Sequence, residues 1–436
     1  MKVALRYMCD AILPEERAMR NYCIKPAVIA ALLLLVAPGC SRPGYEAAHK
    51  GFAAMDKKDW DSAITNYSEA IRLDPKDVSL YYNRGLAYGH RGELDEAVAD
   101  FSKAIRLDPK FGKAYDSRGR AYDEKGELDK AVADYTKAIR LDANDDRAYC
   151  GRGLAYAHKS ESDRAVADFT EAIRLNPKYA VAYCGRGGAL ISLGRLKDSV
   201  TDYSKAIEID PKSAMAYCGR GGALGRLGRL EEALSDFTKA IEIDPKSARA
   251  YAGKGNALDR LGRYEEAVSA YNRAIEMDPK FAGAYTGRGI ALDKLGRIEE
   301  AISAYAAAVE RDPRDVSPRL CIAEDFLCAG NAERCLSELQ KAEEYVKDDK
   351  YRLIVSYLRL MARKTLGQET GELESQFTAL SRQDVDIPWN FGTIERWLQS
   401  GKVDPETKVF ATGLTEGLKA KKREREQSSG SAATRQ

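Results

Sequence analysis

Hydrophobic positions along the middle of the chain follow a helical pattern that returns every 34 residues. Between residues 94 and 105, apolar side chains fall at i, i+3, i+4, i+7, i+10 and i+11, which is one face of an α-helix. A shorter helical pattern over 81–88 precedes it, and Gly92 separates the two. Pro109 ends the second helix, because proline has no N–H and disfavours helix in the residue before it. The pattern therefore predicts a pair of helices in each unit.

Three residue classes keep the same 34-residue step through eight units. The glycines are Gly51, Gly85, Gly119, Gly153, Gly187, Gly221, Gly255 and Gly289. The small residues are Ala63, Ala97, Ala131, Ala165, Ser199, Ala233, Ala267 and Ala301, and the aromatics four positions later are Tyr67, Phe101, Tyr135, Phe169, Tyr203, Phe237, Tyr271 and Tyr305. Such spacing indicates stacked repeats, since one unit cannot bury its apolar face alone. We expect the glycines and small residues where the two helices of a unit cross, and the aromatics between units.

These positions resemble the tetratricopeptide repeat family. The motif reads, in one unit, Tyr81, Gly85, Tyr88, Ala97, Phe101, Ala104 and Pro109. The resemblance covers eight repeats at 44–315, and a degenerate ninth follows at 316–349. It implies an all-α fold, a right-handed superhelical solenoid of helix-turn-helix repeats. In this family a concave groove, lined by the first helix of each pair, binds a protein or peptide.

The resemblance also implies which residues face that groove. Carried over by position, the peptide-binding residues are Tyr82, Leu86, His90, Asp116, Arg120, Asp123, Cys150, Leu154, His158, Cys184, Gly188, Cys218, Gly222, Arg226, Asn256, Asp259 and Asp293. The middle of this set is small and apolar. An interior glycine costs a helix up to about 1 kcal/mol relative to alanine. We therefore expect a neighbouring helix or a ligand to approach the backbone closely at Gly188 and Gly222.

The region after the repeats changes its pattern. We expect a C-terminal helical cap at 350–418, with one helix at 351–366 and others around Trp397 and Leu414. The segment from 386 that contains Trp389 and Trp397 either packs on the end of the solenoid or docks a partner. The tail at 419–436 is predicted to be disordered, because it holds a charge run followed by Ser, Gly and Ala.

Charge gives no reason to expect nucleic acid as a partner. The chain carries 69 Lys and Arg against 67 Asp and Glu, a formal net charge of +2. Basic residues do recur every 34 positions from Arg84 to Arg288. In each unit up to the one that contains Asp236, an aspartate follows the basic residue at a fixed offset, as Asp100 follows Arg84. This pattern favours a ladder of ion pairs inside the solenoid, and a stripe that grips an acidic ligand is the alternative.

The sequence predicts no catalytic site, metal or cofactor. It has three histidines, none in an HExxH motif, and it lacks CxxC pairs and the GxxxxGK[ST] loop. Cys321, Cys328 and Cys335 are interpreted as small buried hydrophobes. A substrate-docking arm of an enzyme such as a glycosyltransferase is disfavoured, because the region after 350 is too small for a catalytic domain.

The N-terminus is typical of an export signal. Residues 27–37 form an apolar run, shorter than the roughly 20 residues that cross a bilayer. The segment around Cys40 resembles a bacterial lipobox, so residues 1–40, with Met19 as the better start, are predicted to be a lipoprotein signal with lipidation at Cys40. This places the protein in the cell envelope, anchored to a membrane or periplasmic. An ordinary cleaved signal or an uncleaved anchor remains an alternative at this position.

The cysteines support a different location. Cys150, Cys184 and Cys218 lie on successive repeats, whose helix axes would be about 8–10 Å apart, whereas a disulfide needs Cα atoms within about 7 Å. We expect free thiols there, which are unusual in exported proteins. A cytoplasmic assembly or adaptor factor is therefore the alternative, and either protein could form a homo-oligomer.

Overall fold

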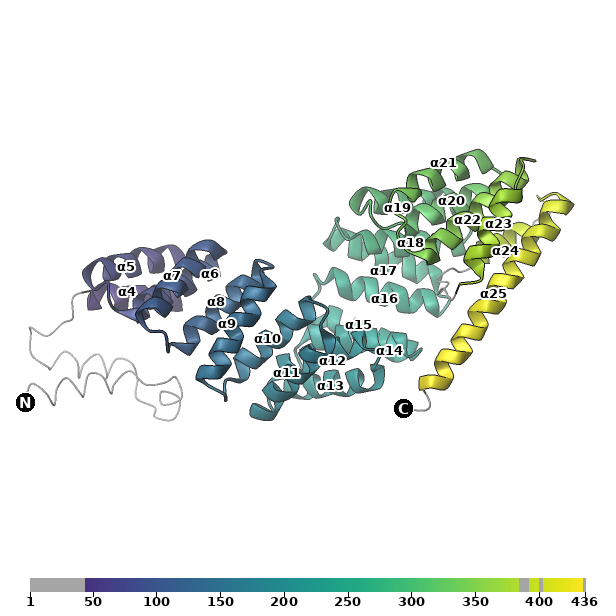
Figure 1. The fold of residues 1–436 in the computed structure, drawn as a ribbon. Helices are drawn as coiled ribbons and strands as arrows, with labels where there is room; N and C mark the ends of the chain where they lie inside the picture. Colours follow the sequence, from purple (N-terminus) through teal and green to yellow (C-terminus); the bar gives the residue numbers. More distant parts are fainter. Residues whose placement is uncertain (1–43, 384–391, 400–402, 434–436) are drawn as a thin grey trace, which may run out of the picture. The chain divides into compact units, whose positions relative to one another are not determined.

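The computed structural model describes residues 44–383, 392–399 and 403–433, and these ranges contain helices α4 to α25 and no strand (Figure 1). The predicted signal at 1–40, Cys40 and Trp389 lie outside these ranges. The chain divides into two compact units, residues 1–161 and 162–436.

The first unit contains helix pairs joined by short turns. Its helices are α4 (Tyr45–Asp56), α5 (Trp60–Leu73), α6 (Val78–Arg91), α7 (Leu94–Leu107), α8 (Gly112–Glu124), α9 (Leu128–Leu141) and α10 (Asp146–His158). Even-numbered helices are the first helix of each repeat, and α4, α6 and α8 each pack against the second helix that follows.

The second unit continues the same pairing and ends in additional helices. The repeat helices are α11 (Ser162–Leu175), α12 (Ala180–Ser192), α13 (Leu196–Ile209), α14 (Ala214–Arg226), α15 (Leu230–Ile243), α16 (Ala248–Arg260), α17 (Tyr264–Met277), α18 (Ala282–Lys294) and α19 (Ile298–Arg311). The C-terminal helices are α20 (Ser317–Cys328), α21 (Ala332–Glu343), α22 (Asp349–Thr365), α23 (Gly371–Ser381), α24 (Gly392–Gln399) and α25 (Pro405–Ala433). The predicted all-α solenoid of helix pairs is confirmed.

Each turn inside a repeat uses a left-handed residue. Gly92 has φ 84° and donates its N–H to the carbonyls that end α6. Ser160 takes the same conformation, with φ 62°, at the equivalent place after α10. A side chain at positive φ is disfavoured by contact between Cβ and the backbone, so this serine turn is the more strained of the two.

In several second helices the aromatic residue is clamped between two glycines. A Cβ on Gly187 of the same repeat would lie 2.9 Å from the Tyr203 ring, and one on Gly219 of the next repeat would overlap that ring. Tyr271 is held in the same way by Gly255 and Gly287. We call this arrangement the glycine clamp. It confirms that the aromatics fill the gap between repeats. It also explains the first glycine of each adjacent pair, Gly187 before Gly188 and Gly221 before Gly222.

The arginine ladder is internal, as predicted. Arg220 donates two hydrogen bonds to Asp236 of its own repeat, both of 2.8 Å, and one of 3.1 Å to Ser204 of the preceding repeat. The same bidentate pairs join Arg84 to Asp100, Arg118 to Asp134 and Arg186 to Asp202. Bidentate pairing fixes the guanidinium geometry. These arginines tie three helices together.

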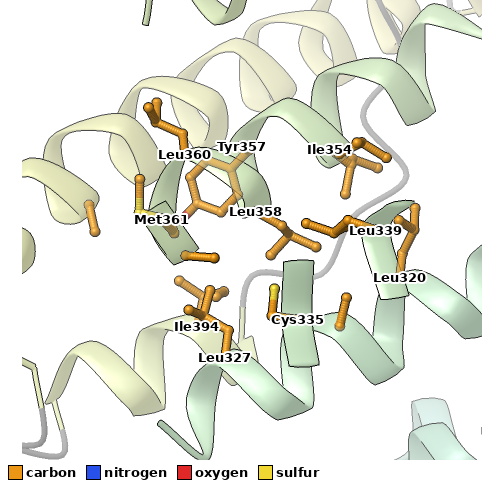
Figure 2. Packing of buried hydrophobic residues seen from close by; sticks show 14 of the residues in the cluster. Leu320, Leu327, Cys335, Leu339, Ile354, Tyr357, Leu358, Leu360, Met361 and Ile394 are labelled. Carbon is orange, nitrogen blue, oxygen red and sulfur yellow. The ribbon is translucent and has the colours of Figure 1, made fainter. Parts of the chain in front are cut away.

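A continuous core of large side chains forms the C-terminal region (Figure 2). Leu320, Leu339, Leu358 and Met361 are completely buried in it, together with Ile394 from α24. Leu, Ile and Met side chains of this kind replace the Ala and Gly packing of the repeats. The predicted helix at 351–366 corresponds to α22.

Two features of this region differ from the sequence predictions. The sequence analysis predicted no helix at Gly371–Ser381, where α23 forms. The tail, expected to be disordered from 419, instead continues α25 to Ala433. Its Lys, Arg, Glu and Ala residues have high helix propensity, and Lys419 adds ion pairs to Glu416 and to Glu395 of α24.

Candidate peptide-binding surface

Within each unit, the first helices form the inner layer. In the first unit α8 contacts both α6 and α10, and in the second unit α12, α14, α16 and α18 contact one another in series. Consecutive second helices of the described residues make no contacts of similar extent. The layer in which neighbours approach more closely is the concave one. The exposed side chains of the first helices therefore line the inner face of each unit.

An aromatic and apolar area covers the start of the inner face. Phe52 of α4 is 57% exposed, and it occupies the repeat position of Leu86, which is half-buried. His90 stacks on Trp60, with ring centroids 4.7 Å apart. Sequence analysis missed Phe52 and Trp60, although stepping back 34 residues from Leu86 would have found the first of them.

Polar groups follow on the inner face of the same unit. His158 Nδ1 lies 3.0 Å from Asp123 Oδ1, which joins consecutive repeats. Asp116 is half-buried; burial and the nearby Asp145 carboxylate raise its pKa to about 6, against the opposing effect of Arg120 and Arg147. Arg120 itself is exposed.

Three of the predicted residues in the first unit pack between repeats to different degrees. Tyr82 makes an edge contact with Phe111, with centroids 5.0 Å apart, and its hydroxyl accepts a hydrogen bond from Ser117. Cys150 is only 2% exposed, whereas Leu154 is half-buried. Cys150 is thus removed from any ligand on the inner face.

The inner face of the second unit is bare in its middle. Gly188, Ile191, Gly222 and Gly225 form what we call the glycine floor. A Cβ on Gly222 would meet nothing within 4 Å, and one on Gly188 would make an ordinary 3.5 Å contact with the Tyr203 hydroxyl. Unlike the glycines of the clamp, these two are not required by internal packing.

Two arginines border the glycine floor, and each hydrogen-bonds to the first helix of the preceding repeat. Arg226 donates a 3.1 Å hydrogen bond to the carbonyl of Ile191, and Arg260 donates one to the carbonyl of Gly225. Both acceptors lie near the C-terminal end of a helix, where positive charge is favoured. Asn256 between them is exposed.

The two cysteines of this face are poor nucleophiles. Cys184 is 7% exposed, and burial raises the pKa of its thiol to about 11. Cys218 is half-buried, and burial raises its pKa as well. A thiol whose pKa is raised holds little thiolate near neutral pH. Both residues act as packing groups between repeats.

Acidic residues mark the far end of the inner face. Lys294 pairs with Asp259 at 2.7 Å, again across one repeat. Asp293 does not face open solvent: its carboxylate accepts a 2.7 Å hydrogen bond from Thr393 of α24. The chain itself therefore covers this predicted ligand-binding residue.

The described residues offer no site for metal chemistry. Among them no group of three or more His, Cys, Asp or Glu side chains is placed to hold a metal ion. A search of the same residues finds no helix with the length and hydrophobicity needed to span a bilayer.

Comparison with known families identifies one repeat type along most of the helical array. Models described as "Tetratricopeptide repeat" match residues 78–111, 146–179, 212–280 and 252–316, and one described as "TPR repeat" matches 51–90, 119–160 and 187–228. Together these matches span more than half of the chain. No curated protein sequence matches.

Several solved structures match part of this chain over nearly their own full length. A tetratricopeptide repeat protein from Parabacteroides merdae is 23% identical over 57% of this chain and 98% of its own, with a TM-score of 0.48. YrrB, a TPR protein described as having an unusual peptide-binding site, is 28% identical over 42% of this chain and 95% of its own, with a TM-score of 0.35. Yeast Tom70 is 16% identical over 77% of this chain and 99% of its own, with a TM-score of 0.40.

Proposed function

Because the chain belongs to the tetratricopeptide repeat family, we propose that it is a non-catalytic scaffold that holds a protein or peptide partner on its inner face. The glycine floor carries this proposal. Gly222 costs its helix up to about 1 kcal/mol relative to alanine, and no neighbouring side chain needs the space. A ligand that approaches the backbone closely is a reason to keep it.

The chemistry of the floor selects the kind of ligand. The floor is apolar, and the arginines at its edge are already engaged with helix carbonyls. An extended or helical segment with apolar side chains fits such a surface, since main-chain and small apolar contacts then supply the affinity. Charged groups near Asp259 would set the direction in which the bound segment runs along the floor.

A groove-blocking substitution tests the proposal. Gly222→Arg places a long side chain over the floor without an internal clash, and Gly188→Arg does the same one repeat earlier. Thr201→Arg adds the same side chain to the exposed part of a second helix, α13, and serves as the control. Affinity capture from cell extract should recover partners with the wild type and with Thr201→Arg but lose them with Gly222→Arg and Gly188→Arg. Partners that remain with all variants would contradict binding on the inner face.

We also propose that the scaffold is tethered to a bacterial membrane through lipidation at Cys40. The apolar run at 27–37 and the lipobox-like segment support this proposal. Mass spectrometry of the mature protein should show loss of the residues before Cys40 and a diacylglycerol adduct on it. A chain that keeps these residues without an adduct would rule out the tether.

One observation favours a cytoplasmic adaptor instead. The six cysteines within the described ranges are free thiols, namely Cys150, Cys184, Cys218, Cys321, Cys328 and Cys335. Free thiols persist mainly in reducing compartments. The same mass measurement separates the two locations, because a cytoplasmic adaptor would keep its N-terminal residues.

A further inference from the structure

Asp293 differs from the two other aspartates at its repeat position, Asp123 and Asp259. At this repeat position, Asp123 lies beside His158 and Asp259 pairs with Lys294, each partner being 35 residues later. The residue 35 after Asp293 is Cys328, which supplies no positive charge. The carboxylate at the end of the array therefore lacks a cation from the next repeat, such as Lys294 supplies to Asp259.

Helix α24 supplies that cation from outside the repeats. Arg396 Nη2 lies 3.4 Å from both carboxylate oxygens of Asp293, and Thr393 Oγ1 donates a 2.7 Å hydrogen bond to Oδ2. The carbonyl of Thr393 in turn accepts a weak hydrogen bond from Cys328 Sγ at 3.8 Å. A hydroxyl and a guanidinium three residues apart thus contact the inner face between α18 and α20.

The other side of α24 is an apolar triad at helical spacing. Ile394, Trp397 and Leu398 are 0%, 4% and 6% exposed. Figure 2 shows Ile394 beside Leu327 of α20. The helix therefore binds as an amphipathic ligand would, with one polar pair and three apolar anchors.

The surface under α24 has more acceptors than α24 satisfies. Asp325 is 2% exposed, and none of the described protein atoms hydrogen-bonds its Oδ2 atom. Burial and the neighbouring Asp293 raise its pKa to about 8, while Arg396 lowers it. With this pKa the Asp325 carboxyl is protonated near neutral pH, and a buried polar atom without a hydrogen-bond partner is destabilising in either state. A ligand that brought a further hydrogen-bonding group would satisfy this surface better than α24 does.

We propose that the inner face between α18 and α20 is a receptor for an amphipathic helix that carries an arginine three residues after a hydroxyl residue, and that α24 is its resident, displaceable occupant. This inference rests on the proposed function, that the inner face holds polypeptide. It adds the partner's chemistry at one end of that face: Arg and Ser or Thr toward Asp293, and large apolar residues toward Leu327. The partner would replace the buried triad with its own.

A labelled synthetic peptide with the sequence of residues 392–403 serves as the probe, added to the full chain. Arg396→Glu puts a like charge beside Asp293, so α24 should leave and the peptide should bind about tenfold more tightly than to wild type. Adding Asp293→Asn should remove that gain. Lys408→Glu makes the same charge change on the exposed part of α25 and should match wild type. Fluorescence anisotropy measures each affinity.

The reactivity of Cys328 gives an independent reading. Its sulfur lies against Thr393, so departure of α24 should expose it. Iodoacetamide labelling, followed by mass spectrometry of the peptide that contains Cys328, should proceed several-fold faster in Arg396→Glu than in wild type or Lys408→Glu. The added peptide should slow it again, and Arg396→Lys should restore slow labelling. Circular dichroism checks that every variant is folded.

Two outcomes would overturn the proposal. If Arg396→Glu matches Lys408→Glu in both measurements, α24 is not held by Asp293. If Cys328 becomes reactive but the peptide gains no affinity, α24 leaves without uncovering a surface that binds a second helix, and the receptor does not exist. Neither result depends on the glycine floor, so the Gly222→Arg capture experiment would still decide the proposed function separately.

Discussion

The repeats and the C-terminal region are both helical, but they are held together by different contacts. In the repeats, packing joins residues at fixed short separations, such as 16 between Arg220 and Asp236. In the C-terminal region the contacts join distant residues, as in Tyr357 with Thr415 and Thr393 with Asp293. The first core consists of Ala, Gly and one aromatic ring per repeat, and the second of large aliphatic side chains.

This difference shows where each region is vulnerable. A repeat depends on a few positions where any added atom clashes. Its stability also includes the interfaces with its neighbours, because stability in such arrays is distributed among the units. The C-terminal core depends on volume, because each large side chain touches several helices. Truncation should therefore harm the cap most, whereas enlargement should harm the repeats.

The largest expected effect is in the cap. Leu358→Ala removes a completely buried side chain and should lower the free energy of unfolding of the C-terminal region by about 2–5 kcal/mol. Leu366→Ala, at a position 37% exposed after the same helix, should cost far less. Urea denaturation followed by circular dichroism measures both. Equal losses would show that the cap does not depend on a packed core.

The repeats should respond to enlargement at the clamp and not at the floor. Gly219→Ala puts a methyl group into the Tyr203 ring and should destabilise by about 1–3 kcal/mol. Gly222→Ala, three residues along the same helix, meets open space and should stabilise by up to about 1 kcal/mol. The denaturation midpoints of the two variants measure this difference in stability. A stabilising Gly219→Ala would contradict the clamp.

The ion-pair ladder should have a smaller effect. Asp236→Ala leaves Arg220 with only Ser204 and should cost about 1–2 kcal/mol. Arg288 is already in this state: position 304 is alanine, and the Arg288 Nε group is buried without a hydrogen-bond partner among the described residues. Ala304→Asp should therefore raise stability by less than about 1 kcal/mol. A loss of stability on adding this aspartate would show that the ladder geometry ends before α19.

The smallest expected effect depends on pH. Asp116 has a folded pKa raised to about 6, above its usual value of 3.8, so the folded state binds more protons between these two values. Its contribution to stability is present below pH 4 and is lost as pH rises to about 6, by about 1 kcal/mol because the side chain is only half-buried. Asp116→Asn should remove this decline when melting temperature is followed against pH. An unchanged pH profile would contradict the assignment.

The sequence predicted what repetition determines. The 34-residue step identified the helix pairs and placed Arg84 and its equivalents in an internal ladder. Among the adjacent glycines, this step accounted for Gly187 and Gly221 but not for Gly188 and Gly222. The glycines that stand 16 residues after five of the aromatics, as Gly219 follows Tyr203, were an unused signal for the clamp.

The sequence could not predict what non-local packing determines. The approach of Thr393 to Asp293 joins segments 100 residues apart, and no periodic pattern connects them. Burial of Cys150 and Cys184 likewise depends on the neighbouring repeat, so a family position alone did not reveal it. Lipidation at Cys40 and the choice of partner stay predictions.

The glycine clamp has a consequence for how the array can change its length. Each ring is shared by two repeats, so excision of residues 203–236 would bring Phe237 between Gly187 and Gly253, which already accommodate rings of this kind. Seams with a glycine on both sides of the ring, such as those at Tyr203, Phe237 and Tyr271, are therefore interchangeable. Loss or gain of a whole repeat among them creates no new kind of contact, so the number of repeats can vary without disturbing the packing between them.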